Sequence, residues 1–123
     1  MNKDAKVFLF IKKEEWNLEN ENLLKKIMSA VKINLETDTN LLLLEAHQDA
    51  YVSDELNPQS NQYFFAFGLN AKRLGIQTRT LPYKWMQIDH LHILFSHTLT
   101  DLQKNVNYKK QLWAVLKEMN INE

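Results

Sequence analysis

Four short apolar runs are separated by helical and polar segments along this chain. They are KVFLFI at 6–11, LLLLE at 41–45, QYFFAFG at 62–68 and LHILFS at 91–96. Continuous apolar runs of this length are typical of strands that are covered on both faces, as in parallel sheets. The pattern therefore predicts the strands of a short central sheet.

The segment between the first two runs predicts an amphipathic helix. Its apolar residues recur at helical spacing and are Leu23, Leu24, Ile27, Met28 and Val31. Acidic residues lie near its start and Lys32 near its end, as the helix dipole favours. A strand, a helix and a second strand in this order predict a right-handed parallel crossover.

The later segments complete the predicted architecture. The chain's two glycines enclose GLNAKRLG at 68–75, which predicts a tight turn and a short helix that ends at Gly75. Residues 46–61 predict a short helix and a loop, whereas the pattern at 76–87 has no clear assignment. A final helix is predicted from the stripe Tyr108, Leu112, Val115, Leu116 and Met119. The whole chain, 1–123, is thus expected to form one α/β domain, a three-layer α/β/α sandwich with a short, mostly parallel sheet of about four strands.

The composition is that of a folded domain, and it limits the kinds of site and the cellular location that we expect. Of the 123 residues, 45% are hydrophobic and 11% aromatic, enough for a core. Without cysteine, a disulfide framework, a thiolate nucleophile and a cysteine zinc site are excluded. The first apolar stretch, 7–11, is too short for a signal peptide or a membrane span. A soluble, cytoplasmic protein with no membrane partner is expected.

Charge is balanced overall but unevenly placed. Residues 33–71 contain acids and no lysine or arginine, whereas 72–88 contain basic residues and no acid. Such a dipolar molecule suits contact with a protein partner better than contact with the uniformly negative backbone of nucleic acid. Solvated loops are the alternative interpretation of the same blocks.

The basic block is interleaved with aromatic residues and is the candidate binding segment. Its candidate binding residues are Lys72, Arg73, Arg79, Tyr83, Lys84 and Trp85. Lysine and arginine side chains can contact the backbone of single-stranded DNA while its bases stack on neighbouring aromatic rings. The same residue types mark protein interfaces, and Trp85 could instead be a core residue under a loop.

Ser96, His97 and Asp101 follow the fourth apolar run, at the strand end where α/β proteins bind ligands. Adjacent residues on an extended chain point to opposite sides, so Ser96 and His97 cannot pair, and a G-x-S-x-G motif is absent. Helix capping explains the segment more simply, in the register of Thr98 or of Thr100. Asn105 or Asn107 is expected to cap the final helix. No catalytic residue is assigned.

His90 and His92 would share one face of a strand, with Asp89 beside them and His47 elsewhere. Two histidines and a carboxylate can hold a metal, as in a metal-dependent hydrolase. No third ligand follows at a fixed spacing, so a polar strand border is the favoured interpretation. Neither a metal nor another cofactor is expected.

The stretch LTDLQKNVNYKKQLW at 99–113 resembles the closing motif of the psi subunit of bacterial DNA polymerase III. The matching positions are Leu99, Thr100, Asp101, Leu102, Asn105, Lys109, Leu112 and Trp113. The order of strands and helices is also similar along nearly the whole chain. The resemblance implies the scaffold of that family, with Trp113 buried as a large core aromatic beside the three leucines.

The psi fold is similar to that of uracil-DNA glycosylases, and YFFAFGLNAKRLG and SHTLT resemble two glycosylase segments. Those enzymes carry a Gly-x-Asp-Pro-Tyr loop after the first strand, where this chain has IKKEEWN. A glycosylase without this acid is not expected to cleave a base. The resemblance thus implies a non-enzymatic protein. A degenerate glycosylase-like domain that binds single-stranded DNA through 72–85 is the alternative.

The resemblance also implies partners among replication proteins. In the psi family the core binds the chi subunit and an N-terminal tail binds the clamp loader. Here the first strand starts at about Lys6, which is expected to leave no room for such a tail. Clamp-loader binding would then need another surface. The function implied is a protein-interaction accessory of DNA replication.

Overall fold

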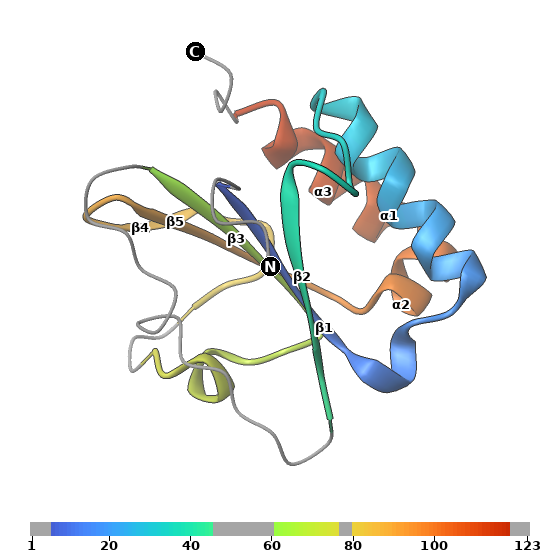
Figure 1. The fold of residues 1–123 in the computed structure, drawn as a ribbon, viewed down its shortest axis with the longest axis horizontal. Coiled ribbons are helices and arrows are strands. Elements are labelled where there is room, and N and C mark those ends of the chain that lie inside the picture. The colour runs from blue at the N-terminus through green and yellow to red at the C-terminus, as the bar shows by residue number, and fades with distance from the viewer. Residues whose placement is uncertain (1–5, 46–60, 77–79, 119–123) are drawn as a thin grey trace.

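A computed structural model describes residues 6–45, 61–76 and 80–118 (Figure 1). The elements in chain order are β1 (Val7–Lys12), the 3-10 helix η1 (Lys13–Glu15), α1 (Leu18–Ala30), β2 (Thr39–Leu44), β3 (Gln62–Phe67), the 3-10 helix η3 (Ala71–Leu74), β4 (Met86–Ile88), β5 (Leu91–Ser96), α2 (Leu99–Lys104) and α3 (Val106–Leu116). Within these residues no helix has the length and apolar character needed to cross a membrane.

The strands form one sheet in the order β2-β1-β3-β5-β4. The first four neighbours in this order run parallel, and they are the four apolar runs of the sequence. The fifth strand, β4, pairs antiparallel with β5 after a tight turn in which Asp89 has a φ of 52°. It falls in the segment that the sequence pattern left unassigned. A three-residue edge strand is too short for a periodic signal, and only its pairing with β5 defines it.

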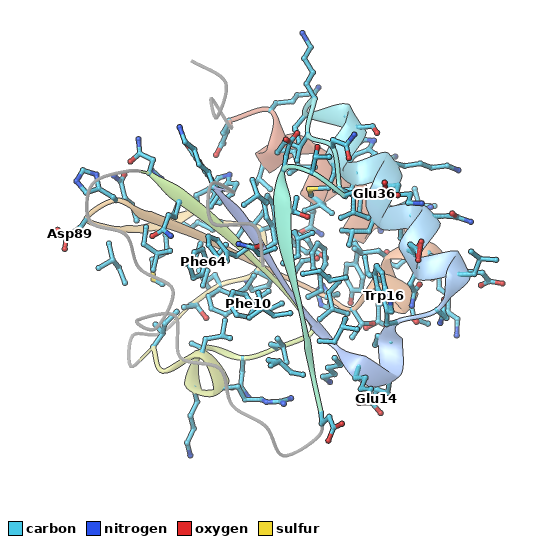
Figure 2. The ribbon with its side chains drawn as sticks, in the orientation of Figure 1. Phe10, Glu14, Trp16, Glu36, Phe64 and Asp89 are labelled. Atoms are coloured by element: carbon cyan, nitrogen blue, oxygen red, sulfur yellow. The ribbon has the colours of Figure 1, made fainter. Side chains whose placement is uncertain are left out.

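The α/β class and the mostly parallel sheet are confirmed. All three α-helices pack on one face of the sheet, and η3 lies on the opposite face (Figure 1). Alternate strand residues serve the two faces, as the pleat requires. On the helix side the strands contribute Val7, Leu9, Ile11, Phe65, Phe67 and Leu94. On the other side Phe10 and Phe64 pack together in the middle of the fold, with ring centroids 5.4 Å apart (Figure 2).

Two helix boundaries follow the sequence prediction. Helix α1 begins after Asn17, whose side chain accepts a hydrogen bond from the backbone N–H of Asn20. Its buried apolar residues, Leu24, Ile27 and Met28, belong to the predicted stripe. The short helix η3 ends at Gly75, as predicted, in the left-handed conformation with a φ of 74°. The helix and loop predicted within 46–61 lie, except for Asn61, outside the described residues.

The acidic and basic blocks meet within this chain at the carboxyl end of β2. The Arg73 guanidinium donates a 2.8 Å hydrogen bond to the backbone carbonyl of Glu45. The Glu45 carboxylate forms an ion pair with the Lys13 ammonium group at 3.2 Å, and both side chains are exposed. Exposed pairs of this kind add little stability. Of these two contacts, the one from the basic block is made to a backbone carbonyl, and Lys13 lies outside that block.

Candidate interaction surface

Ser96, His97 and Asp101 lie near one another in sequence, but they do not form a Ser-His-Asp chain. The buried Ser96 hydroxyl donates to the backbone carbonyl of His97 at 3.1 Å. The His97 Nδ1 lies 2.7 Å from the hydroxyl of Tyr83. Asp101 is exposed, and its backbone N–H donates to the Thr98 hydroxyl at 3.1 Å. Thr98 is therefore the cap of α2, the second of the two predicted registers.

His97 belongs instead to an aromatic cluster at the carboxyl end of β5. Its ring lies flat on Tyr108, with centroids 3.7 Å apart and an interplanar angle of 5°. Burial is the main cause that raises the pKa of Tyr83 above its ordinary value of 10.0, against smaller opposing effects of its hydrogen bonds with Ser96 and His97. The cluster ties the segment before β4 to α3.

Gly68 lies at the same carboxyl edge of the sheet, directly after β3. Its φ is 72°, and a Cβ atom there would lie 2.3 Å from Cγ2 of Thr98. Its backbone N–H donates to the carbonyl of Ser96 at 2.7 Å. Glycine is needed here for both its conformation and its lack of a side chain. The end of β3 and the start of α2 are thus in close backbone contact where α/β proteins often bind ligands.

The predicted binding segment 72–85 does not form one surface, which corrects the sequence interpretation. Lys72 and Arg73 lie in η3, which packs on the face opposite the helices, whereas Tyr83 and Trp85 belong to the helix-side core. Tyr83 is buried, so its ring offers no platform for a base. The reason is that Ile76, after η3, packs on the face opposite the helices, whereas Tyr83 packs on the helix side. Lys84 is exposed, and Arg79 lies outside the described residues.

Trp85 takes the core alternative of its three predicted roles. Its indole Nε1–H donates to the backbone carbonyl of Val115 at 3.0 Å. Its ring meets Phe65 and Tyr63 edge-on, at centroid distances of 5.5 Å and 6.1 Å. Trp85 therefore holds α3 against the sheet.

His90 and His92 occupy a strand border. The ring of His92 stacks on Tyr63 at a centroid distance of 4.7 Å. Burial, with a smaller effect of the neighbouring His90, lowers the pKa of His92. In the described ranges, no group of three or more histidine, aspartate or glutamate side chains is placed to hold a metal ion. His47 lies outside those ranges.

Most residues of the psi-like motif maintain the fold. Leu99, Leu102 and Leu112 are buried in the helix-side core. The Asn105 side chain accepts hydrogen bonds from the backbone N–H groups of Asn107 and Tyr108, at 3.0 Å and 3.2 Å. Asn105, of the two predicted alternatives, is thus the cap of α3.

Thr100 joins a polar network around Asn20, which the sequence interpretation missed. The Asn20 amide is 1% exposed and donates to the Thr100 hydroxyl at 3.1 Å and to the backbone carbonyl of Glu15 at 2.6 Å. Its carbonyl oxygen accepts from the side-chain amide of Gln103 at 2.6 Å. The signal was present in the sequence, because Asn20 precedes Leu24 by four residues and so falls on the buried stripe. The network fixes α1 to α2.

Trp113 is exposed, contrary to the expectation of a buried core aromatic. It retains 41% of its accessible surface. Leu112 and Leu116 face the sheet, and each residue of a helix is rotated by about 100° from its neighbour, so Trp113 points away from the core. Four other exposed residues lie on the same side of the helix at spacings of three and four. Together they form the α3 outer stripe, defined as Val106, Lys109, Lys110, Trp113 and Lys117.

No protein-family model matches this chain, and no curated protein matches it.

Among the described residues, the α3 outer stripe is a surface where exposed apolar side chains lie among lysines. Val106 is 65% exposed, so two large apolar side chains face solvent on one helix among lysines. Protein interfaces are enriched in tryptophan and surround an apolar centre with a polar rim. The arrangement is suited to binding.

Proposed function

We propose that this protein is a non-enzymatic protein-interaction accessory of DNA replication that resembles the core of the psi subunit of DNA polymerase III. The proposal rests first on the motif at 99–113. Five of its positions have a role in folding: three leucines in the core, Thr100 in the Asn20 network and Asn105 as a cap. Asp101 lies in the first turn of α2, where the helix dipole favours an acid. Lys109 and Trp113 are left on the surface.

The exposure of Trp113 is the single observation that carries the interaction part of the proposal, whereas the psi part rests on the motif at 99–113. Apolar area in water is unfavourable, and the large aromatic side chain of Trp113 is 41% exposed. Contact with a partner would remove this ring from water, and tryptophan is enriched among the residues that dominate binding at interfaces. The non-catalytic part of the proposal is supported by the hydrogen bonds of Ser96 and His97. The Ser96 hydroxyl bonds to the backbone carbonyl of His97, and the His97 ring bonds to the hydroxyl of Tyr83.

Affinity capture from the lysate of the protein's own host tests the role. Tagged protein is incubated with and without nuclease, and the bound proteins are identified by mass spectrometry. We expect a clamp-loader subunit, a chi-like protein or single-strand-binding protein to remain after nuclease treatment. Retention of nucleic acid without these proteins would contradict the proposal and favour the glycosylase-like DNA-binding alternative.

A further inference from the structure

The α3 outer stripe has the size of a binding site for a short protein segment. Val106 and Lys117 are its two ends, and at 1.5 Å per residue they lie about 16 Å apart along the helix axis. Trp113 lies between lysines in both directions along the chain, Lys110 before it and Lys117 after it. Ala114, next to Trp113 in the chain, is also exposed.

We propose that the α3 outer stripe binds an acidic protein segment that places an apolar side chain against Trp113. This inference rests on the proposed function, because it names the surface and the chemistry of the partner. Carboxylates of the segment would contact the lysines, and its apolar residue would remove the Trp113 ring from water. In protein interfaces, much of the binding free energy usually comes from a central aromatic residue, which is surrounded by polar and charged contacts.

Charge complementarity selects an acidic partner. Helix α3 contains lysines and no aspartate or glutamate. Among the residues that the structure describes, no carboxylate lies within ion-pair distance of a stripe lysine. Lys104, at the end of α2, adds a further positive charge before the stripe. Asp101, Glu118 and Glu15, whose carboxylate accepts a hydrogen bond from the Thr100 backbone N–H at 3.3 Å, are described acids near these helices, and all three lie outside the stripe.

Two other occupants fit the stripe less well. Single-stranded DNA is held by several rings in succession, but the neighbouring rings of Tyr108 and Trp85 are engaged with His97 and with Val115. The chain also has no net charge, whereas nucleic-acid binding gains affinity from a broad excess of positive charge. A second copy of this chain would bring the same lysines against one another, and like charges in contact are unfavourable.

Binding of a synthetic peptide to the full chain tests the inference. The probe is a fluorescently labelled amphipathic peptide of about 15 residues, long enough to cover the stripe. It carries Asp and Glu on one face and Leu and Phe on the other. A matched peptide with Asn and Gln in place of the acids is the control for charge, and fluorescence anisotropy at low and high salt gives the affinity.

We expect the acidic peptide to bind and the neutral peptide to bind much more weakly. Trp113→Ala should weaken binding by about tenfold or more, as for an anchor residue. The double variant Lys109→Gln with Lys110→Gln should weaken it several-fold at low salt and have little effect at high salt, because exposed charges are screened. Matched controls are Ile88→Ala, with an exposed apolar residue on β4, and Lys72→Gln on η3; both should bind like the parent.

Equal binding of the two peptides, no binding, or unchanged affinity in Trp113→Ala would overturn the inference. Binding of oligothymidylate that is lost in Trp113→Ala, without binding of the acidic peptide, would assign the stripe to nucleic acid. The two proposals fail separately. Replication proteins captured equally by Trp113→Ala would keep the role and reject the stripe, whereas peptide binding without replication proteins in the capture would reject only the role.

Discussion

The indole Nε1–H of Trp85 donates a 3.0 Å hydrogen bond to the backbone carbonyl of Val115, 30 residues further along the chain. This contact fastens the last turn of α3 to the segment that precedes the edge strand β4. Trp85 and Trp113, which precedes Val115 by two residues, have opposite roles. Trp85 is half-buried and hydrogen-bonded, whereas Trp113 presents its ring to solvent.

Substitution of the two tryptophans should therefore affect stability very differently. Trp85→Phe removes one hydrogen bond and should lower the free energy of unfolding by about 1 kcal/mol. Trp85→Ala should lower it by about 2–3 kcal/mol, somewhat less than a fully buried tryptophan would. Trp113→Ala is the control and should change it by less than about 0.5 kcal/mol. Urea denaturation followed by circular dichroism measures all three, and a large loss in Trp113→Ala would show that its ring is packed.

Removal of the Asn20 amide should weaken the attachment of α1 to α2 and so lower the stability of the protein. Asn20→Ala leaves the Glu15 carbonyl and the Thr100 hydroxyl without this partner in a buried place, at a cost of about 1–3 kcal/mol in the free energy of unfolding. Asn22→Ala, at an exposed position of the same helix, should be nearly neutral. A double-mutant cycle with Thr100→Ala should give a nonzero coupling energy. Strict additivity of the two substitutions would argue against a direct Asn20–Thr100 contact.

The close approach of Gly68 and Thr98 gives a prediction about the carboxyl edge of the sheet. Gly68→Ala should destabilise the protein by about 1–3 kcal/mol or more, because alanine at a φ of 72° is strained and its Cβ would collide with Cγ2 of Thr98. Thr98→Ser removes that methyl group and keeps the capping hydroxyl. In the double variant, part of the lost stability should return, since the collision is relieved but the backbone strain is not. Thermal unfolding compares the variants, and no recovery in the double variant would place the whole cost in the backbone.

Stability at alkaline pH should depend on Tyr83. Its pKa is raised in the folded protein, chiefly by burial, while in the unfolded chain it keeps its ordinary value of 10.0. The unfolded chain then releases this proton first as the pH rises. The contribution of Tyr83 is therefore fully present below pH 10.0 and is lost as the pH rises through the folded-state pKa.

Denaturation at several values between about pH 8 and about pH 11 measures this effect. Lysines titrate in the same range, so the comparison is between the parent and Tyr83→Phe at each pH. The parent should lose more stability on going to high pH than the variant does. An identical pH dependence of the two proteins would mean that Tyr83 ionises equally easily folded and unfolded.

The sequence by itself determined the α/β class, the four parallel strands and helix α1. These features depend on local pattern, because a buried strand and an amphipathic helix each leave a periodic apolar signature. The caps Thr98 and Asn105 and the ending of η3 at Gly75 were also within its reach, since they depend on residues a few positions apart. Even the outward direction of Trp113 follows from the stripe of Leu112 and Leu116.

Tertiary structure alone decided the rest. Strand β4 exists through pairing at the sheet edge, and Trp85 became a core residue because α3 lies over it with a carbonyl at the right place. The segment 72–85 was divided between two faces of the sheet by the path of the chain, which no local spacing records. Which surface remains exposed depends on how the elements pack against one another. For that reason the candidate interaction surface moved from the basic-aromatic segment to α3.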